Sequence, residues 1–158
     1  MTSPEELAYW GEDGYDYTSQ RQIIARMEEA FYPVPIYEGL VDDNEMVKLY
    51  AKHGANPVII VNFSGAVAAP KRYLGILGAA HDTNEIATSV QVISTSQEVS
   101  NRILSKVSRV LLGYAPDGCG EMSPALYSSP GKINSLGTPT RYTSIQIYTH
   151  YVNSKAVC

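Results

Sequence analysis

The stretch "IATSVQVISTSQEVSNRILSKVSRVLLGY" (Ile86–Tyr114) contains two different hydrophobic periods that follow one another without a linker. Its first part, Ile86–Thr95, alternates well enough to predict a β-strand. Its second part, Ser96–Leu112, repeats apolar residues at helical spacing and predicts an amphipathic helix. The apolar face of this helix comprises Val99, Ile103, Leu104, Val107, Val110 and Leu111. Gly113 and Pro116 should end the helix, because glycine accepts left-handed dihedrals and proline cannot continue a helix.

A second amphipathic helix is predicted upstream, from about Ser19 to Tyr32. Its apolar stripe consists of Ile23, Ile24, Met27, Ala30 and Phe31. Ser19 is a favourable N-cap residue. Pro33 and Pro35 should terminate the helix, because proline disfavours helical geometry in the residue before it.

Three further stretches predict strands. "VPIYEGLV" (Val34–Val41) indicates a short strand, and "PVIIVNFSG" (Pro57–Gly65) indicates a central one, because its β-branched run is apolar on both faces. "RYTSIQIYTHYV" (Arg141–Val152) alternates as in an antiparallel strand with one solvated or interfacial side. The expected apolar face comprises Thr143, Ile145, Ile147, Thr149 and Tyr151, and the expected polar face comprises Tyr142, Ser144, Gln146, Tyr148 and His150.

The remaining segments are irregular by sequence. Ala66–Glu85 is punctuated by glycine and predicts a long hairpin or flap, in which Arg72–Leu77 could pair as an edge strand. Ala125–Thr140 predicts a loop. Two amphipathic helices packed on one face of a mostly antiparallel sheet would bury both apolar stripes in the simplest way, so the expected fold class is α+β.

Length and composition limit the protein further. The 158 residues suit one domain, expected over residues 18–152, with an N-terminal arm at 1–17 and a C-terminal tail at 153–158. The net charge of -4 argues against a nucleic-acid-binding role, which needs a concentrated footprint of Lys and Arg. No apolar run approaches the ~20 residues of a membrane span, and the first 17 residues are acidic where a signal peptide is basic. We therefore expect an intracellular protein.

The candidate nucleophiles lack the neighbours that catalysis requires. Cys119 lies between Asp117 and Glu121 after a helix C-terminus, and these anions oppose thiolate formation. Ser64 in "NFSGA" lacks the G-x-S-x-G pattern of a nucleophile elbow, so a turn residue is expected. The two cysteines form neither a disulfide framework nor a zinc motif, and reduced thiols are expected.

The histidines and glycines indicate no metal or cofactor site. His53, His81 and His150 lack metal-ligand spacing. His81 has two nearby acids, Asp82 and Glu85, but a solvated loop tip is the expected role of this cluster. The flap glycines lack the spacing of a phosphate loop. No catalytic residue, cofactor or metal is therefore predicted.

Cations recur on the helix predicted at Ser96–Leu112. Arg102, Lys106 and Arg109 form a basic stripe beside its apolar face. Such a stripe is usually a solvated surface, and the alternative is a contact with acids of a neighbouring copy, such as Asp42, Asp43 and Glu45. Twelve tyrosines against two phenylalanines favour a protein interface, because tyrosine buries its ring while its hydroxyl stays hydrated. Tyrosines on a wet sheet face remain the alternative.

The stretch "VQVISTSQEVSNRILSKVSRVLLGYAPDGCGEMSP" (Val90–Pro124) resembles the corresponding part of the tail terminator proteins of long-tailed, siphovirus-type phages. The shared features are a strand with small polar residues, an amphipathic helix ending in "LLGY", a Pro-Asp-Gly-Cys-Gly loop and a final tyrosine-bearing strand. The resemblance covers most of Ile23–Val152, and the segment before Tyr17 matches no family pattern. It implies an α+β subunit, not an enzyme, in a six-membered ring that caps the tail tube, stops its polymerisation and provides the head-attachment surface.

The resemblance also implies partners and locations. The partners are further copies of the chain, the tail tube protein and the head-completion or connector protein, and DNA would pass through the ring lumen without sequence-specific binding. The chain would occur in the host cytoplasm during assembly and then in the neck of the virion. The predicted interface residues are Lys71, Arg72, Tyr73, Arg102, Lys106, Arg109 and Tyr148. The alternatives are a head-completion or connector protein and, from another class, a small enzyme that depends on Cys119 or His81.

Overall fold

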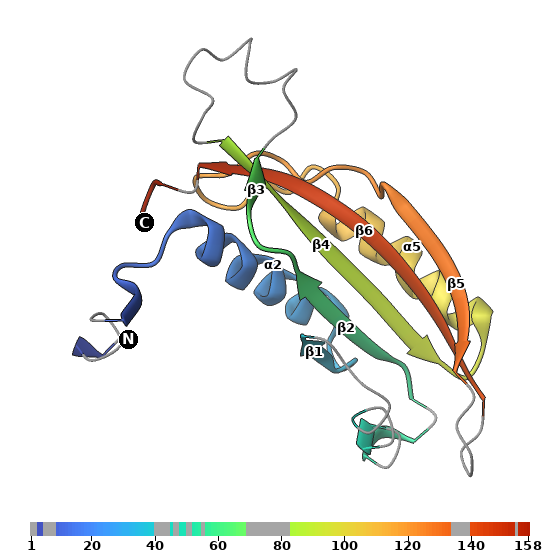
Figure 1. Ribbon diagram of the computed structural model, residues 1–158. Coiled ribbons are helices and arrows are strands. Elements are labelled where there is room, and N and C mark those ends of the chain that lie inside the picture. Colours follow the sequence, from blue (N-terminus) through green and yellow to red (C-terminus); the bar gives the residue numbers. More distant parts are fainter. Residues whose placement is uncertain are drawn as a thin grey trace.

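The computed structural model describes residues 3–4, 9–39, 45, 48–49, 52–54, 56–68, 83–133, 140–153 and 155–158. Two long helices and one sheet form the body of the protein (Figure 1). The elements, in chain order, are α2 (Tyr15–Phe31), β1 (Ile36–Glu38), β2 (Val58–Phe63), β3 (Val67–Ala68), β4 (Thr83–Ser94), α5 (Gln97–Leu111), β5 (Tyr127–Ile133) and β6 (Arg141–Asn153).

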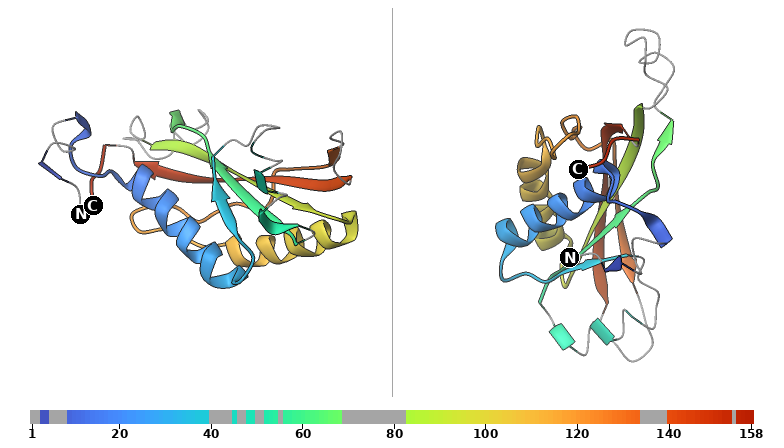
Figure 2. Two further views of the ribbon diagram at one scale, coloured as in Figure 1. Left: turned by 90° about the horizontal axis from the view of Figure 1, so that it is seen from below. Right: turned by 90° about the vertical axis from the view of Figure 1, so that its left-hand side faces the viewer.

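The sheet has the strand order β1-β2-β4-β6-β5, and β3 pairs with β4 beside this path. Only β1 and β2 are parallel, and the other neighbours pair antiparallel. Strand β4 pairs with β6 along its whole length, from Thr83 opposite Asn153 to Ser94 opposite Tyr142. Both helices cover the same face of the sheet (Figure 2). The expected α+β fold with a mostly antiparallel sheet is confirmed.

Helix α5 forms almost where its pattern predicts it. Ser96 is the N-cap, and its side chain accepts a hydrogen bond from the Val99 amide at 3.1 Å. At the other end, Gly113 adopts a φ of 76°, which a side chain would disfavour, and its amide donates to the Met122 carbonyl. The helix buries Leu104, Val107 and Leu111 against the sheet, as its apolar period requires.

Helix α2 starts earlier than predicted. It begins at Tyr15 with Gly14 as N-cap, and its first turn therefore lies in the predicted arm. The prediction that Ser19 caps this helix is wrong. Ser19 lies one turn inside it, fully buried, where its hydroxyl donates to the Asp16 carbonyl at 2.9 Å. A serine hydroxyl inside a helix can donate its hydrogen bond to a carbonyl of the preceding turn, so a serine before an apolar stripe does not always mark the start of a helix.

The strand predictions hold for the interior of the sheet and fail at one edge. Strand β2 lies inside the sheet, and its residues from Val58 to Val61 are all buried. Strand β5, in contrast, occupies part of the stretch that was predicted as a loop, Ala125–Thr140. It contains Pro130 and Gly131, which weaken a strand pattern but are tolerated at a sheet edge. The expected edge strand at Arg72–Leu77 lies outside the described residues.

The main core lies between the sheet and the two helices. Residues from α2, β2, β4, α5 and β6 contribute to it, together with Met122 from the loop after α5. A smaller cluster on the opposite face joins Val58, Ile60 and Ile93, with Tyr37 and Leu49 packed against it. Two further contacts hold the helices together: Arg26 donates to the Val110 carbonyl at 2.8 Å, and Lys106 donates to the Ala30 carbonyl at 2.6 Å.

The two faces of β6 are reversed relative to the prediction. Tyr148 and His150, expected on the wet or interfacial face, are fully buried under the helices. Ile145 and Ile147, expected on the core side, are only half-buried on the opposite face. The physical reason is that the helices supply hydroxyls, so the polar atoms of β6 find partners within the core.

Candidate functional site

Tyr148 ties β6 to α5 inside the core. Its hydroxyl lies 2.9 Å from the Ser108 Oγ atom and donates to the Gln146 Oε1 atom at 2.6 Å. Burial raises the pKa of this phenol above its ordinary value. The prediction that Tyr148 belongs to an exposed interface is therefore wrong, because its ring is fully enclosed within the subunit.

Replacing Tyr148 with phenylalanine should lower the free energy of unfolding by about 1–2 kcal/mol, because the ring stays packed while the hydrogen bonds of the hydroxyl are lost. The Ser108 hydroxyl also donates to the Gln146 Oε1 atom at 3.2 Å, so Ser108 and Gln146 still have a hydrogen-bond partner when the tyrosine hydroxyl is removed. Tyr127→Phe is the matched control, because Tyr127 is exposed. Urea denaturation of both variants checks the prediction, and equal stabilities would contradict it.

His150 lies on the same buried row of β6. Its Nε2 atom is 2.9 Å from the Ser19 Oγ atom, and burial lowers its pKa to about 4. Since the Ser19 hydroxyl already donates to Asp16, the imidazole must donate from Nε2 and carry its lone pair on Nδ1. Among the described residues, Nδ1 has no hydrogen-bond partner. This histidine pairs with a serine hydroxyl that is fully buried, and in the part of the chain that the structure describes no acid is paired with its Nδ1 atom, so the contact is structural.

The two cysteines approach the start of α2. Cys119 is half-buried with its sulfur 3.8 Å from the Tyr15 carbonyl oxygen, and the Cys158 sulfur lies 3.0 Å from the Thr18 hydroxyl. The pKa of Cys119 is raised, first by burial and then by nearby acidic groups that include Asp117. A raised pKa lowers the thiolate fraction, which is the opposite of what a catalytic cysteine requires.

Each side chain of the basic stripe of α5 has a partner within its own subunit. Lys106 caps the end of α2 through the Ala30 carbonyl, and its ammonium lies 4.8 Å from the ring centre of Phe31. Arg102 pairs with Glu98 on the same helix at 2.8 Å, with both side chains well exposed. Arg109 donates to the Ser105 hydroxyl at 2.9 Å and is exposed. All three side chains of this stripe are therefore exposed, and Lys106 differs from the other two in that its partner lies on α2.

The sheet face opposite the helices carries no charge across its middle. We call this the uncharged face, and it comprises two cross-strand rows, Asn62-Ser89-Ile147-Tyr127 and Ile60-Gln91-Ile145-Ser129. Most of these side chains are half-buried, and Tyr127 is exposed at its margin. Neither α2 nor α5 covers the two rows (Figure 2), although Leu49 packs against the cluster that contains Ile60, at one end of the second row. A surface with so few charges is typical of the interior of a protein contact.

Other features offer little chemistry. A shallow hollow of about 380 Å³ lies where α5 begins beside β5, lined by Gln97, Pro130, Gly131, Lys132 and Tyr142. Within the described ranges, no three His, Cys, Asp or Glu side chains gather where they could hold a metal. Likewise, none of the helices described there is long and apolar enough to cross a membrane. The predicted interface residues Lys71, Arg72 and Tyr73, and the cluster of His81 and Asp82, lie outside the described residues.

Sequence reasoning missed two exposed groups of apolar residues. Leu126 and Tyr127 stand at the start of β5, in a stretch that was expected to be a loop. Tyr9 and Trp10 stand on the segment before α2, where an arm was expected but no contact was assigned. Clusters of aromatic residues outside any amphipathic pattern were the available clue.

No family model matches the chain, and no curated protein matches it. The structure itself defines the class: an α+β protein whose sheet has α2 and α5 on one face and uncharged rows of side chains on the other.

Proposed function

We propose that the protein is a structural subunit that assembles into a ring through repeated surface contacts, and that this ring caps the tail tube of a long-tailed phage. The observation that carries the proposal is the uncharged face, a broad surface without charged side chains on a protein of net charge -4. The resemblance of Val90–Pro124 to tail terminators supports the tube as partner. In the structure this stretch forms the last part of β4, all of α5 and the loop after it.

The ring would be a hexamer that contacts the tube protein on one side and the head-completion or connector protein on the other. It would assemble in the host cytoplasm and remain in the neck of the virion. A head-to-tail contact between different surfaces of identical subunits closes into a ring when its rotation permits. The basic residues Arg102 and Arg109 would lie at or beside such contacts.

Negative-stain electron microscopy with light scattering tests this proposal. Closed rings with a central hole are expected from the purified protein or from its mixture with preformed tail tubes. A chain that stays monomeric in both settings would contradict the proposal. In the phage that encodes the chain, a nonsense codon should give overlong tubes, whereas tailless or leaking heads would favour a connector protein.

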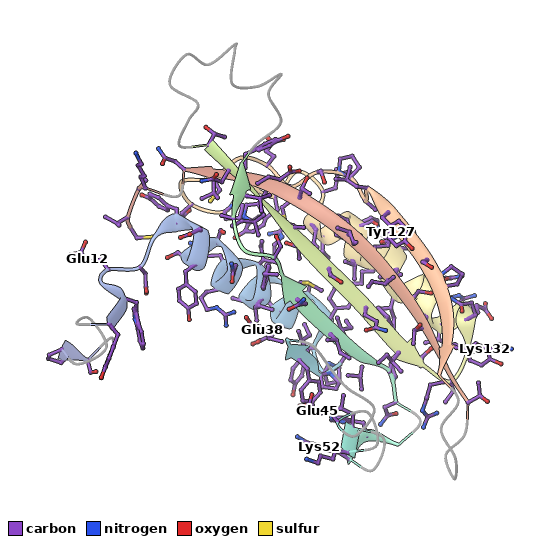
Figure 3. All side chains as sticks on the ribbon, in the orientation of Figure 1. Glu12, Glu38, Glu45, Lys52, Tyr127 and Lys132 are labelled. Atoms are coloured by element: carbon purple, nitrogen blue, oxygen red, sulfur yellow. The ribbon has the colours of Figure 1, made fainter. Side chains whose placement is uncertain are left out.

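Reversing the charge of Arg102 and Arg109 to glutamate should weaken assembly, and more at low salt than at high salt, because salt screens exposed charges. The fold should survive, since the pair of Arg102 with Glu98 is exposed and worth only about 0.5 kcal/mol. Lys52→Glu with Lys155→Glu is the control, because it changes the net charge equally, both lysines are exposed, and Lys52 lies away from α5 (Figure 3). Light scattering at two salt concentrations measures the effect, and identical assembly of both double variants would leave the α5 stripe simply solvated.

A further inference from the structure

Three segments that are far apart in the sequence meet at the first turn of α2. One of them is the tail, residues 155–158, whose end lies beside the start of α2 (Figures 1 and 2). The Tyr15 amide donates a hydrogen bond to the Ala156 carbonyl at 3.2 Å, and the Cys158 amide donates one to the Asp13 carbonyl at 3.2 Å. The backbone of the tail is therefore fastened to the residues at which α2 begins.

The loop after α5 packs against the same turn. Gly118 lies so close to the ring of Tyr15 that a side chain at this position would collide with the ring. The next residue, Cys119, pairs with Val152 of β6 in an antiparallel bridge. Cys119 is thus held between the start of α2 and the end of β6, and the chain's other cysteine stands on the tail.

The two thiols contact neighbouring groups of this turn. The Cys119 sulfur lies 3.8 Å from the Tyr15 carbonyl oxygen, and the Cys158 sulfur lies 3.0 Å from the Thr18 hydroxyl oxygen. Tyr15 and Thr18 are three residues apart in α2, so they lie on one face of the helix with their Cβ atoms about 5–6 Å apart. A helix carbonyl also points toward the next turn, which brings the Tyr15 oxygen close to the Thr18 side chain. The two sulfur atoms therefore lie over the same face of a single helical turn.

The pKa of Cys119 responds to the second cysteine. Burial raises this pKa most, a hydrogen bond with the Ser19 side chain lowers it, and the negative charge of an ionised Cys158 raises it. Charges in salt solution act on one another over about 10 Å or less, so this effect requires the two cysteines to be close. Ser19 and Thr18 are adjacent in α2, so the hydrogen bonds of the two thiols also end at adjacent residues.

From this arrangement we propose that Cys119 and Cys158 are a redox pair that forms a disulfide within the subunit, and that this bond fastens the tail to the loop after α5. A disulfide needs its two Cα atoms about 4.4–6.8 Å apart. The tail lies beyond Asn153, the last paired residue of β6, so Cys158 can move to this distance without breaking the sheet. Each cysteine side chain can also change its rotamer, which turns its sulfur toward the other.

The oxidant is a small disulfide such as oxidised glutathione. Cys158 is exposed, so its thiolate attacks first and forms a mixed disulfide while one reduced glutathione leaves. The Cys119 thiol then gives its proton to solvent, and its sulfur displaces the second glutathione as the bond between the two cysteines forms. Two electrons and two protons thus leave the protein, and the oxidant ends as two reduced glutathiones.

The bond gives the tail a free state and a fastened state. Thiols stay reduced in a cytoplasm, whereas disulfides persist in oxidising surroundings outside the cell. The timing rests on the proposed function, in which the chain passes from the host cytoplasm into a virion, but the bond itself does not rest on it. The bond closes a loop of about 40 residues and should lower the equilibrium constant of unfolding about 30-fold or more.

Oxidation of the folded native chain tests the pair. In oxidised glutathione the chain should lose both free thiols, stay a covalent monomer and lose the mass of two hydrogen atoms. Proteolysis should then release a fragment with Cys119 joined to a fragment with Cys158. In urea the oxidised chain should be more stable than the reduced chain by the stated factor, and Cys158→Ser should show no such difference.

Cys158→Ser with Ser128→Cys is the matched control, because it keeps two cysteines in the chain. Ser128 is exposed on β5 and pairs with Gln146. Along β6, Gln146 lies six residues, about 20 Å, from Val152, the bridge partner of Cys119. This variant should therefore form no disulfide within the subunit.

Two results would overturn the redox pair. One is a folded native chain that keeps both thiols or takes up two glutathiones, and the other is an internal disulfide in the control variant. Electron microscopy of rings reports on the proposed function separately. A native chain that forms the disulfide but assembles neither alone nor on tail tubes would overturn the ring and leave the redox pair standing.

Discussion

Replacing Leu111 with alanine is expected to lower the free energy of unfolding by about 2–5 kcal/mol. The Leu111 side chain is fully buried in the last turn of α5 and belongs to the main core between the helices and the sheet. Its truncation removes apolar contacts and leaves a cavity that the rigid surroundings fill only in part. Urea denaturation followed by circular dichroism measures the change.

The adjacent residue provides the matched control. Leu112 has the same side chain but is 56% exposed, so Leu112→Ala should change the free energy of unfolding by no more than about 0.5 kcal/mol. A loss of similar size in both variants would contradict the assignment of the buried face of α5. The same result would also undermine the register of α5 on the sheet.

Lowering the pH from 6.5 to 4 is expected to remove about 3 kcal/mol of stability through His150 alone. Burial lowers the pKa of His150 from 6.5 to about 4, a difference of roughly 2.5 units at 1.36 kcal/mol per unit. Between these two pH values His150 is protonated in the unfolded chain but stays neutral in the folded chain, so the free energy of unfolding falls as the pH falls. Above pH 6.5 the contribution is complete, and below about pH 4 its loss is complete.

His150→Gln isolates this contribution, because glutamine can still donate to the Ser19 hydroxyl but does not titrate. The variant should be less stable than the native chain at pH 7 and should show a flatter dependence on pH between 6.5 and 4. His53→Gln is the matched control, since His53 is a second histidine that is only partly buried. Urea denaturation at several pH values measures all three proteins, and parallel curves for the native chain and His150→Gln would refute the prediction.

These core variants and the surface variants address different properties of the protein. Leu111 and His150 are fully buried, so their replacement acts on the stability of one subunit. Arg102 and Arg109 are exposed, so their replacement should act on assembly and leave the subunit folded. A variant that changes one property without the other therefore shows which surface or core contact is responsible.

The sequence by itself determined the elements whose pattern is local. Helix α5 follows from an apolar period and an N-cap that lie within one short stretch, and Ser96 caps it as expected. Strand β2 follows from a β-branched run that is apolar on both faces, which only an interior strand can bury. These two patterns, with the helix that became α2, were sufficient to predict the α+β class.

The tertiary structure decided what depends on partners distant in the chain. Tyr148 and His150 can be buried because α5 and α2 bring Ser108 and Ser19 to them. The alternation of residues along β6 does not reveal these partners. The bond of Lys106 to the end of α2 likewise depends on a partner far away in the sequence. Strand β5 exists because β6 offers it a ladder of hydrogen bonds, although its own residues favour a loop. A polar side chain can be buried only where a hydrogen-bond partner meets it, and an edge strand forms only beside a neighbouring strand. Both kinds of partner lie far away in the sequence and are known only from the folded chain.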